Sequence, residues 1–318
     1  MEIPSDESFV ESKIAYVFPG QGSQQVGMGK ELSDNFKSAK ELFSEIDDAL
    51  EFPLTKLMFQ GPADELTKTM NSQPAIMAAT LAAWLGMKEV LGPESMPEPS
   101  LVAGHSLGEY TALVISGVLN VSDAVRLVKD RGNLMQKAAE KVPGSMAAIL
   151  GLDEPTVDEI CRETGAQISN VNADDQMVIA GDLVALARAM DLAAVRGAKR
   201  LIRLQVGGAF HSRLMLPAEQ GIRDALHQYK FNDPVIPIIA NSTGNPLVSA
   251  KAVKAELVRQ LCSCVQWKRS VSYMIGAGVG MFYEIGPGRV LSSLIKRSYP
   301  EVPIVSISDP ASIYALSI

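Results

Sequence analysis

The strongest constraint on the fold of this chain is Pro99–Gly117, a stretch in which one serine lies between two glycines. Its apolar start predicts a strand over 101–103 and its end predicts a helix over 109–118, so residues 104–108 (GHSLG) must form the turn between them. The turn matches the G-x-S-x-G pattern of a nucleophile elbow, in which the serine, here Ser106, has a strained backbone. Side chains two residues before and after the serine would collide with the neighbouring strand and helix, which explains both glycines. The pattern favours a serine nucleophile at a helix N-terminus over an ordinary strand-to-helix turn.

A serine in this position needs a base and a group that stabilises negative charge. The free N–H of Leu107 and the helix dipole can stabilise an oxyanion on a substrate carbonyl. Histidine is the usual base at neutral pH, and the chain has three histidines. His105 adjoins Ser106 and should point away from it, and His227 lies in an amphipathic helix. His211, in a glycine-flanked loop, is left as the predicted base, although an isolated histidine is more often structural.

A glycine-rich loop, Pro19–Gln24, follows the predicted strand Ile14–Phe18. It does not match a nucleotide-binding motif, because G-x-G lacks its third glycine and Met28 stands where a Walker motif needs lysine. Its backbone N–H groups can approach a ligand closely, with Gln21 between the two glycines. A strained structural turn is the other interpretation.

The composition is that of a globular α/β protein and excludes several classes of function. At 318 residues the chain is long enough for two domains, or for one large domain with an insertion. A net charge of −7 argues against nucleic-acid binding, and three cysteines are too few for a disulfide framework. No apolar run reaches the roughly 18 residues of a membrane span, and the acidic N-terminus is unlike a signal peptide. We expect a soluble protein that is cytoplasmic, or stromal if a plastid transit peptide was removed, and that has no membrane or nucleic-acid partner.

Several helices are predicted around the central stretch. We expect a surface helix over 30–50 and a buried helix over 75–90, the latter capped by residues 71–74. Ser122 is the predicted N-cap of the next helix. Arg131 lies on the apolar side of that helix, so it needs a buried anion as its partner unless its stem extends to the surface.

Residues 145–206 differ from the rest in the order of their predicted elements, βαββαβ, which is typical of a ferredoxin-like unit. We expect an inserted small domain over 145–206, with hinges at 143–144 and 207–208. The large domain then consists of 1–144 and 207–318, and its strands are continuous apolar segments, as in a buried parallel sheet. The predicted fold class is α/β, with an α/β-hydrolase-like large domain and an inserted ferredoxin-like small domain. Beyond the insertion, we expect helices over 217–229 and 250–261, strands over 235–240 and 281–285, and a last helix from 286–288 toward Arg297.

Several motifs are spread along nearly the whole chain: FPGQGSQ (18–24), SQPAI (72–76), GHSLGEY (104–110), Arg131-Gly132, GAFH (208–211), Gln260-Leu261 with Trp267, and EIGPG (284–288). Together, and in this order, they resemble the motifs of the malonyl-CoA:acyl-carrier-protein transacylases of fatty acid synthesis. The resemblance implies an acyltransferase that moves a malonyl group from malonyl-CoA to the pantetheine thiol of an acyl carrier protein. The implied route has two halves, with a malonyl ester on the serine between them.

The resemblance also implies roles for individual residues. Ser106 and His211 would form a catalytic dyad, and the backbone carbonyl of Gln260 would orient the imidazole in place of an acidic residue. The N–H groups of Gln21 and Leu107 would form the oxyanion hole. Arg131 would bind the malonyl carboxylate. That carboxylate would be the buried anion that the helix pattern requires.

Two further residues bear on the substrate pocket. The ring of Phe210, beside His211, should leave little room at the malonyl C2, so methylmalonyl-CoA should be a poor substrate. Cys264 stands where many members of the family have proline, which affects the expected loop geometry near Gln260.

The implied partners are malonyl-CoA and an acidic acyl carrier protein; we expect no cofactor, no metal and a monomer. Carrier-protein docking needs basic residues, and the favoured cluster is Arg196, Lys199, Arg200 and Arg203. A second cluster is Arg289, Lys296 and Arg297. Two other classes of function remain open: a serine esterase or thioesterase, which shares the elbow, and a non-catalytic scaffold that keeps the fold.

Overall fold

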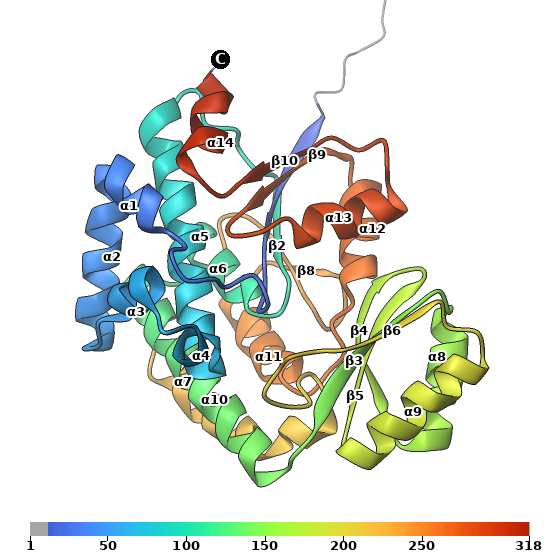
Figure 1. The fold of residues 1–318 in the computed structure, drawn as a ribbon. Coiled ribbons are helices and arrows are strands. Elements are labelled where there is room, and N and C mark those ends of the chain that lie inside the picture. The colour runs from blue at the N-terminus through green and yellow to red at the C-terminus, as the bar shows by residue number, and fades with distance from the viewer. Residues whose placement is uncertain (1–11, 318) are drawn as a thin grey trace, which may run out of the picture.

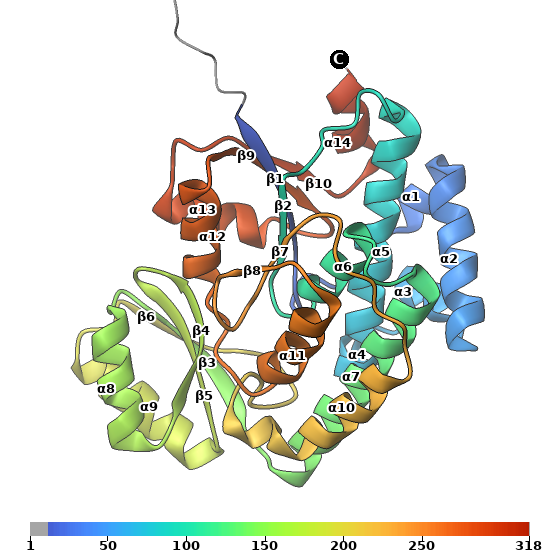
Figure 2. The same ribbon diagram turned by 180° about the vertical axis from the view of Figure 1, so that it is seen from behind.

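A computed structural model describes residues 12–317 and shows two separate β-sheets with helices packed around them (Figures 1 and 2). The acidic segment 1–11, on which the expectation of no signal peptide rests, lies outside the described residues, as does Ile318.

The larger sheet lies at the centre of the molecule and has six strands in the order β10-β9-β1-β2-β7-β8. Its strands are β1 (Lys13–Phe18), β2 (Leu101–Gly104), β7 (Ile238–Ile239), β8 (Pro246–Leu247), β9 (Val279–Ile285) and β10 (Ile304–Ile307). The central strands pair in parallel, and only β8 runs antiparallel to its neighbour. Every residue of β2 is buried, as expected for a parallel strand that is covered on both faces.

Helices lie on both faces of this sheet, some of them in an outer layer that packs on other helices (Figures 1 and 2). They are α1 (Lys30–Asn35), α2 (Lys37–Leu50), α3 (Leu54–Gln60), α4 (Ala63–Thr67), α5 (Thr69–Leu91), α6 (Gly108–Ile115), α7 (Val121–Lys141), α10 (Glu219–His227), α11 (Ala250–Gln260), α12 (Trp267–Gly276), α13 (Val290–Ser298) and α14 (Pro310–Tyr314). Two 3₁₀ helices are η1 (Arg213–Ala218) and η2 (Ala315–Ser317).

The helix α5 forms the centre of the helical layer beside the sheet (Figure 1). It begins at Thr69, so the predicted cap at 71–74 is wrong: these residues lie within the helix, with Pro74 inside it. The helix is long and apolar enough to cross a membrane by length and composition, and is the one such helix among residues 12–317. Of its most apolar window, 67% is buried within the protein, as in the core helix of a folded domain.

Other predicted boundaries also needed correction. The single helix expected over 30–50 is two helices, because Phe36 has an extended backbone between α1 and α2. The N-cap of α7 is Asn120, whose Oδ1 accepts the N–H of Asp123 at 2.7 Å, whereas the Ser122 hydroxyl donates to Glu45.

The C-terminal part also differs from the prediction. The segment 217–229 is a 3₁₀ turn followed by α10, and the strand expected over 235–240 is reduced to Ile238–Ile239. The helix α13 begins after the 286–288 loop but is not the last element, because β10 and α14 follow it. The pattern of residues 267–276 did not identify α12 as a helix.

The smaller sheet lies in residues 145–206 and has the predicted βαββαβ order: β3 (Ser145–Leu150), α8 (Glu154–Thr164), β4 (Gln167–Ala173), β5 (Gln176–Gly181), α9 (Leu183–Val195) and β6 (Arg200–Arg203). Its strand order is β4-β5-β3-β6, and all pairs are antiparallel. The helices α8 and α9 cover its outer face (Figure 1).

Successive residues of β3 point to opposite faces of the smaller sheet. Ala147 and Ile149 pack with α8 and α9. Met146 and Ala148 point the other way and belong to the core shared with the larger sheet. The inner face of the small sheet is therefore directed at the central part of the molecule.

Candidate active site

The elbow at Ser106 has the backbone that the sequence predicts. It joins β2 to α6, and the φ of Ser106 is +53°, in the left-handed region. A Cβ on Gly104 would lie 1.8 Å from the carbonyl carbon of Gly108. A Cβ on Gly108 would lie 2.1 Å from the carbonyl oxygen of Phe18 on the neighbouring strand. The two glycines are thus needed because the elbow leaves no room for side chains.

Asn241, which follows β7 in the chain, holds the elbow in place. Its Oδ1 accepts the N–H of Ser106 at 2.7 Å, and its Nδ2 donates to the carbonyl of Gly104 at 2.6 Å. The side chain therefore bridges both sides of the strained turn. The sequence motifs did not identify this residue.

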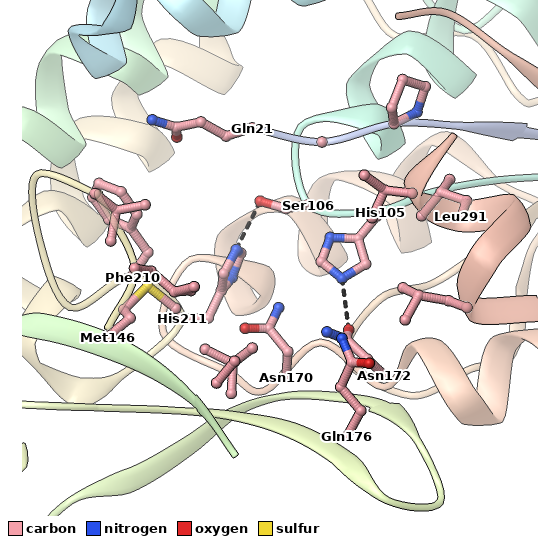
Figure 3. Close-up of a pocket in the computed structure, with 18 of the residues that line it drawn as sticks. Gln21, His105, Ser106, Met146, Asn170, Asn172, Gln176, Phe210, His211 and Leu291 are labelled. Atoms are coloured by element: carbon pink, nitrogen blue, oxygen red, sulfur yellow. Dashed lines mark hydrogen bonds between the residues drawn. The ribbon is translucent and has the colours of Figure 1, made fainter. Parts of the chain in front are cut away.

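Ser106 and His211 are brought together from distant parts of the chain (Figure 3). The Oγ of Ser106 lies 2.7 Å from the Nε2 of His211, and the Nδ1 of His211 lies 2.8 Å from the carbonyl oxygen of Gln260. With Nδ1 donating to that carbonyl, Nε2 is left free to accept the serine proton. Cys264 has not disturbed this arrangement, since the Gln260 carbonyl is in place.

The other histidines lie elsewhere. His105 points away from the serine, as expected, and its Nε2 lies 3.0 Å from the Oδ1 of Asn172 on the small sheet (Figure 3). His227 is the last residue of α10.

Arg131 is buried beside the serine, with 1% of its surface exposed, so its stem does not extend to the surface. Its Nη1 donates to Oε1 of Gln73 at 2.7 Å, and its Nη2 donates to Oε1 of Gln260 at 2.9 Å and to Oγ of Ser106 at 3.2 Å. The guanidinium also lies 5.0 Å from the ring centroid of Tyr110.

No carboxylate among residues 12–317 lies within ion-pair distance of Arg131, and its Nε has no acceptor there. A buried cation without an anion is costly, so a site of this kind favours an anionic ligand.

A cavity of about 240 Å³ opens in front of Ser106, between the large sheet and the inner face of the small sheet. Gln21, Phe210 and His211 line it from the large sheet's side, and the small sheet contributes Met146 among other residues (Figure 3). Most of its wall is apolar, so the cavity can take a chain with few charges and direct it at the serine.

The backbone N–H groups of Gln21 and Leu107 are both available. Neither donates to an acceptor among the residues that the structure describes. Leu107 directly precedes α6, and Gln21 lies in the loop after β1. The Gln21 loop is held close to the elbow, because a Cβ on Gly20 would lie 2.6 Å from the His105 carbonyl oxygen.

Burial and, to a smaller extent, the positive charge of Arg131 lower the pKa of His211 to about 3. The imidazole is therefore neutral at physiological pH and can accept a proton.

Comparison with known proteins identifies the family of this chain. The family model described as "Acyl transferase domain" matches residues 15–313. This chain belongs to that acyltransferase family. It is 42% identical to the malonyl CoA-acyl carrier protein transacylase of Bacillus subtilis over 95% of both chains. It is 40% identical to the protein of the same name from Escherichia coli K12, over 96% of this chain and 98% of that one.

Solved structures of similar proteins have the same fold as this acyltransferase. One is an acyl-carrier-protein-S-malonyltransferase from Bartonella henselae, which is 39% identical, with a TM-score of 0.92 over 96% of this chain and 100% of that one. Another is a malonyl-transacylase in complex with its type II PKS acyl-carrier protein, which is 41% identical, with a TM-score of 0.91 over 96% of this chain and 99% of that one.

The basic clusters of the acyltransferase differ in how far they are already paired. Arg196 forms ion pairs with Glu159 and Glu163, at 2.9 and 3.1 Å, whereas Lys199, Arg200 and Arg203 are exposed. In the second cluster, Arg297 is paired with Asp175 at 2.6 Å. The first cluster therefore offers three cations, not four, to a partner.

In addition to Asn241, two more buried polar residues contact the site. Gln73 accepts from Arg131 and belongs to the SQPAI motif, although the motif alone does not indicate its contact. Glu109 is fully buried in the apolar helix α6. A carboxylate in such a helix is the signal that could have drawn attention to it.

Proposed function

We propose that this acyltransferase transfers a malonyl group from malonyl-CoA to the pantetheine thiol of an acyl carrier protein, through a malonyl ester of Ser106. The observation that carries the proposal is Arg131, a buried cation that has no carboxylate within ion-pair distance among residues 12–317 and lies 3.2 Å from the serine oxygen. A free carboxylate on the acyl group would supply the missing anion. The relatives match nearly the whole chain, and their names, malonyl CoA-acyl carrier protein transacylase, support the same substrate.

In the first half-reaction, His211 accepts the Ser106 proton as the hydroxyl oxygen attacks the thioester carbonyl. The carbonyl oxygen becomes negative, and the N–H groups of Gln21 and Leu107 stabilise it. The C–S bond then breaks, and the proton on His211 passes to the departing thiolate of CoA. The malonyl ester remains on Ser106.

In the second half-reaction the roles reverse. His211 accepts the proton of the pantetheine thiol as the thiol sulfur attacks the ester carbonyl. When the C–O bond of the ester breaks, His211 gives this proton to the oxygen of Ser106. The carbonyl of Gln260 keeps the imidazole in one orientation through both halves. Arg131 holds the carboxylate in place between them, since a guanidinium can bind both carboxylate oxygens.

The fold supports a division of the chain into two domains. We assign an α/β-hydrolase-like large domain to 1–144 and 207–318, and a ferredoxin-like small domain to 145–206. The supporting features are the elbow on a mostly parallel sheet and the antiparallel βαββαβ order of the smaller sheet. The reaction as proposed needs no cofactor or metal, and a monomeric enzyme in the cytoplasm would suffice for it.

Incubation with malonyl-CoA followed by intact mass measurement tests the proposal. We expect one malonyl adduct on the native enzyme and none on Ser106→Ala, because the described elbow presents only this hydroxyl to His211. Turnover of malonyl-CoA without an adduct would favour an esterase or thioesterase. Neither adduct nor turnover would favour a scaffold without activity, and an adduct on Ser106→Ala would overturn the assignment of the nucleophile.

A further inference from the structure

The network behind Ser106 contains a carboxylate that the proposed reaction does not use. Glu109 is the second residue of α6, and none of its surface is exposed. A carboxylate is costly to bury unless hydrogen bonds replace those it made to water. The partners of Glu109 therefore indicate why it is there.

Both oxygens of Glu109 accept hydrogen bonds from residues that hold the site. Its Oε1 accepts the backbone N–H of Asn241 at 3.1 Å, and its Oε2 accepts from Nε2 of Gln260. Asn241 bridges the elbow around Ser106. Gln260 binds Arg131 through its side chain and orients the imidazole through its carbonyl. Glu109 thus connects the supports of the nucleophile, the base and the guanidinium.

The side-chain amide of Gln260 can serve these contacts in only one orientation. Its Oε1 must face Arg131, which can only donate, and its Nε2 must face the carbonyl oxygen of Ser106 at 2.9 Å and Glu109. Rotating the amide by 180° would set its NH₂ group against the guanidinium and its oxygen against the Ser106 carbonyl. An acceptor at Glu109 therefore favours the orientation in which Gln260 holds Arg131.

We propose that Glu109 is a positioning residue, which fixes the Gln260 amide so that Arg131 is held where the acyl carboxylate binds. This inference rests on the proposed function, because its specific effect falls on an acyl group that carries a carboxylate. A glutamine at position 109 would have the same shape but one NH₂ group. That group would face either the N–H of Asn241 or the NH₂ of Gln260, a donor against a donor in both cases.

Glu256 provides a matched control. It is also a buried carboxylate, with 2% of its surface exposed. Burial raises the pKa of Glu109, and Glu256 lies close enough to contribute to the same rise. Its oxygens accept from the N–H and the hydroxyl of Ser242, and neither group contacts Ser106, His211 or Arg131. Since the Ser242 hydroxyl can also accept, Glu256→Gln keeps a hydrogen-bonded arrangement.

The test compares acylation of the native enzyme, Glu109→Gln and Glu256→Gln by malonyl-CoA and by acetyl-CoA in single-turnover experiments, with thermal unfolding measured for each. We expect Glu109→Gln to slow malonyl acylation by about tenfold to a hundredfold, the usual effect of leaving a buried donor without its acceptor. Acetyl acylation should fall much less, so the malonyl to acetyl ratio should drop about fivefold or more, while Glu256→Gln keeps the native ratio. A merely structural role would slow both acyl groups alike, and an unchanged ratio in Glu109→Gln would overturn the inference.

If Glu109→Gln does not fold, Gln260→Met tests the same connection. Methionine has nearly the shape of glutamine and leaves the backbone carbonyl in place, but it cannot accept from Arg131 as the amide oxygen does. The same drop in the malonyl to acetyl ratio is expected, and an unchanged ratio counts against the inference. A native enzyme that takes up no malonyl group would instead overturn the proposed function, which keeps the two failures distinct.

Discussion

At the scale of single residues, the contacts of Arg131 predict a change of specificity. In Arg131→Ala the malonyl group loses its cation, and we expect malonyl acylation to fall by about 10² or more. The acetyl group has no carboxylate to pair, so its acylation should change little. Rates for both thioesters, measured by mass spectrometry on the same preparation, decide the question. Equal losses for both acyl groups would mean that Arg131 only supports the fold.

The low pKa of His211 predicts an unusual pH profile. An ordinary histidine, with a pKa near 6.5, would lose most of its basic form by about pH 5.5. Because burial lowers the pKa of His211 to about 3, the acylation rate should stay within about twofold between pH 7 and pH 5.5. Single-turnover acylation across this range is the measurement. A fall with a midpoint near pH 6.5 would contradict the low pKa.

The same shift predicts how stability depends on pH. Between about pH 6.5 and pH 3 the unfolded chain binds a proton at His211 that the folded chain does not. The free energy of unfolding should therefore decrease as the pH falls through this window, and His211 should contribute no slope above it. Denaturant unfolding of the native enzyme and of His211→Gln at several pH values should show a smaller slope for the variant. Equal slopes would indicate that other groups cause the pH dependence.

At the scale of elements, the space around each glycine predicts different outcomes for a substitution in the elbow and for one elsewhere. In Gly108→Ala the new Cβ would meet the backbone of Phe18 and Pro19, which cannot move aside cheaply. We expect a loss of about 3 kcal/mol or more in the free energy of unfolding, together with loss of the malonyl adduct. Gly276, at the end of α12, is the control, because a Cβ there meets nothing within 4 Å. Gly276→Ala should be neutral or stabilise by up to about 1 kcal/mol, and similar losses in both variants would refute the steric explanation.

The elements whose formation depends on local pattern could be predicted from the sequence. The small sheet follows from the order of its short apolar and helical segments, and the elbow follows from its two glycines. Helix boundaries were harder to predict, because Asn120 and Ser122 are both good N-caps and only the contact with Glu45 explains what the serine does instead. The strand at 235–240 is short because Pro237 has no N–H to donate to a neighbouring strand, and the N–H of Val235 donates to Ser116 outside the sheet.

The site shows the same division between local and tertiary information. Ser106 and His211 could be placed from their glycine-flanked surroundings. The roles of Asn241 and Glu109 could not be predicted, since they come from hydrogen bonds between segments more than 130 residues apart in the chain.

At the scale of the whole molecule, the charge distribution predicts where a carrier protein docks. The exposed residues Lys199 and Arg200 lie where β6 begins, shortly before the segment that leads to His211. We expect Lys199→Glu with Arg200→Glu to raise the KM for the carrier protein several-fold and to flatten its salt dependence, because attraction of an acidic partner is lost. Acylation by malonyl-CoA should be nearly unchanged.

The control for this prediction is Lys40→Glu with Lys56→Glu, which makes the same change in charge. These lysines lie on α2 and α3, on the side of the molecule away from the small sheet (Figure 1). If the control raises the KM equally, net charge and not a local surface is responsible. If neither pair changes carrier kinetics, the docking surface lies elsewhere, and Arg289 and Lys296 are the next residues to reverse.

The order of strands in the large sheet also has a consequence for how the protein is made. The strand β1 pairs with β9, so Ala15 lies beside Phe282, a residue that a ribosome adds hundreds of residues later. The small sheet pairs within 145–206 and can form while the rest of the chain is still being synthesised. His211 and the carbonyl of Gln260 likewise follow the insertion in the chain. The nucleophile is therefore made early but gains its base only after the small sheet has been made, so a shortened nascent chain carries an inert serine.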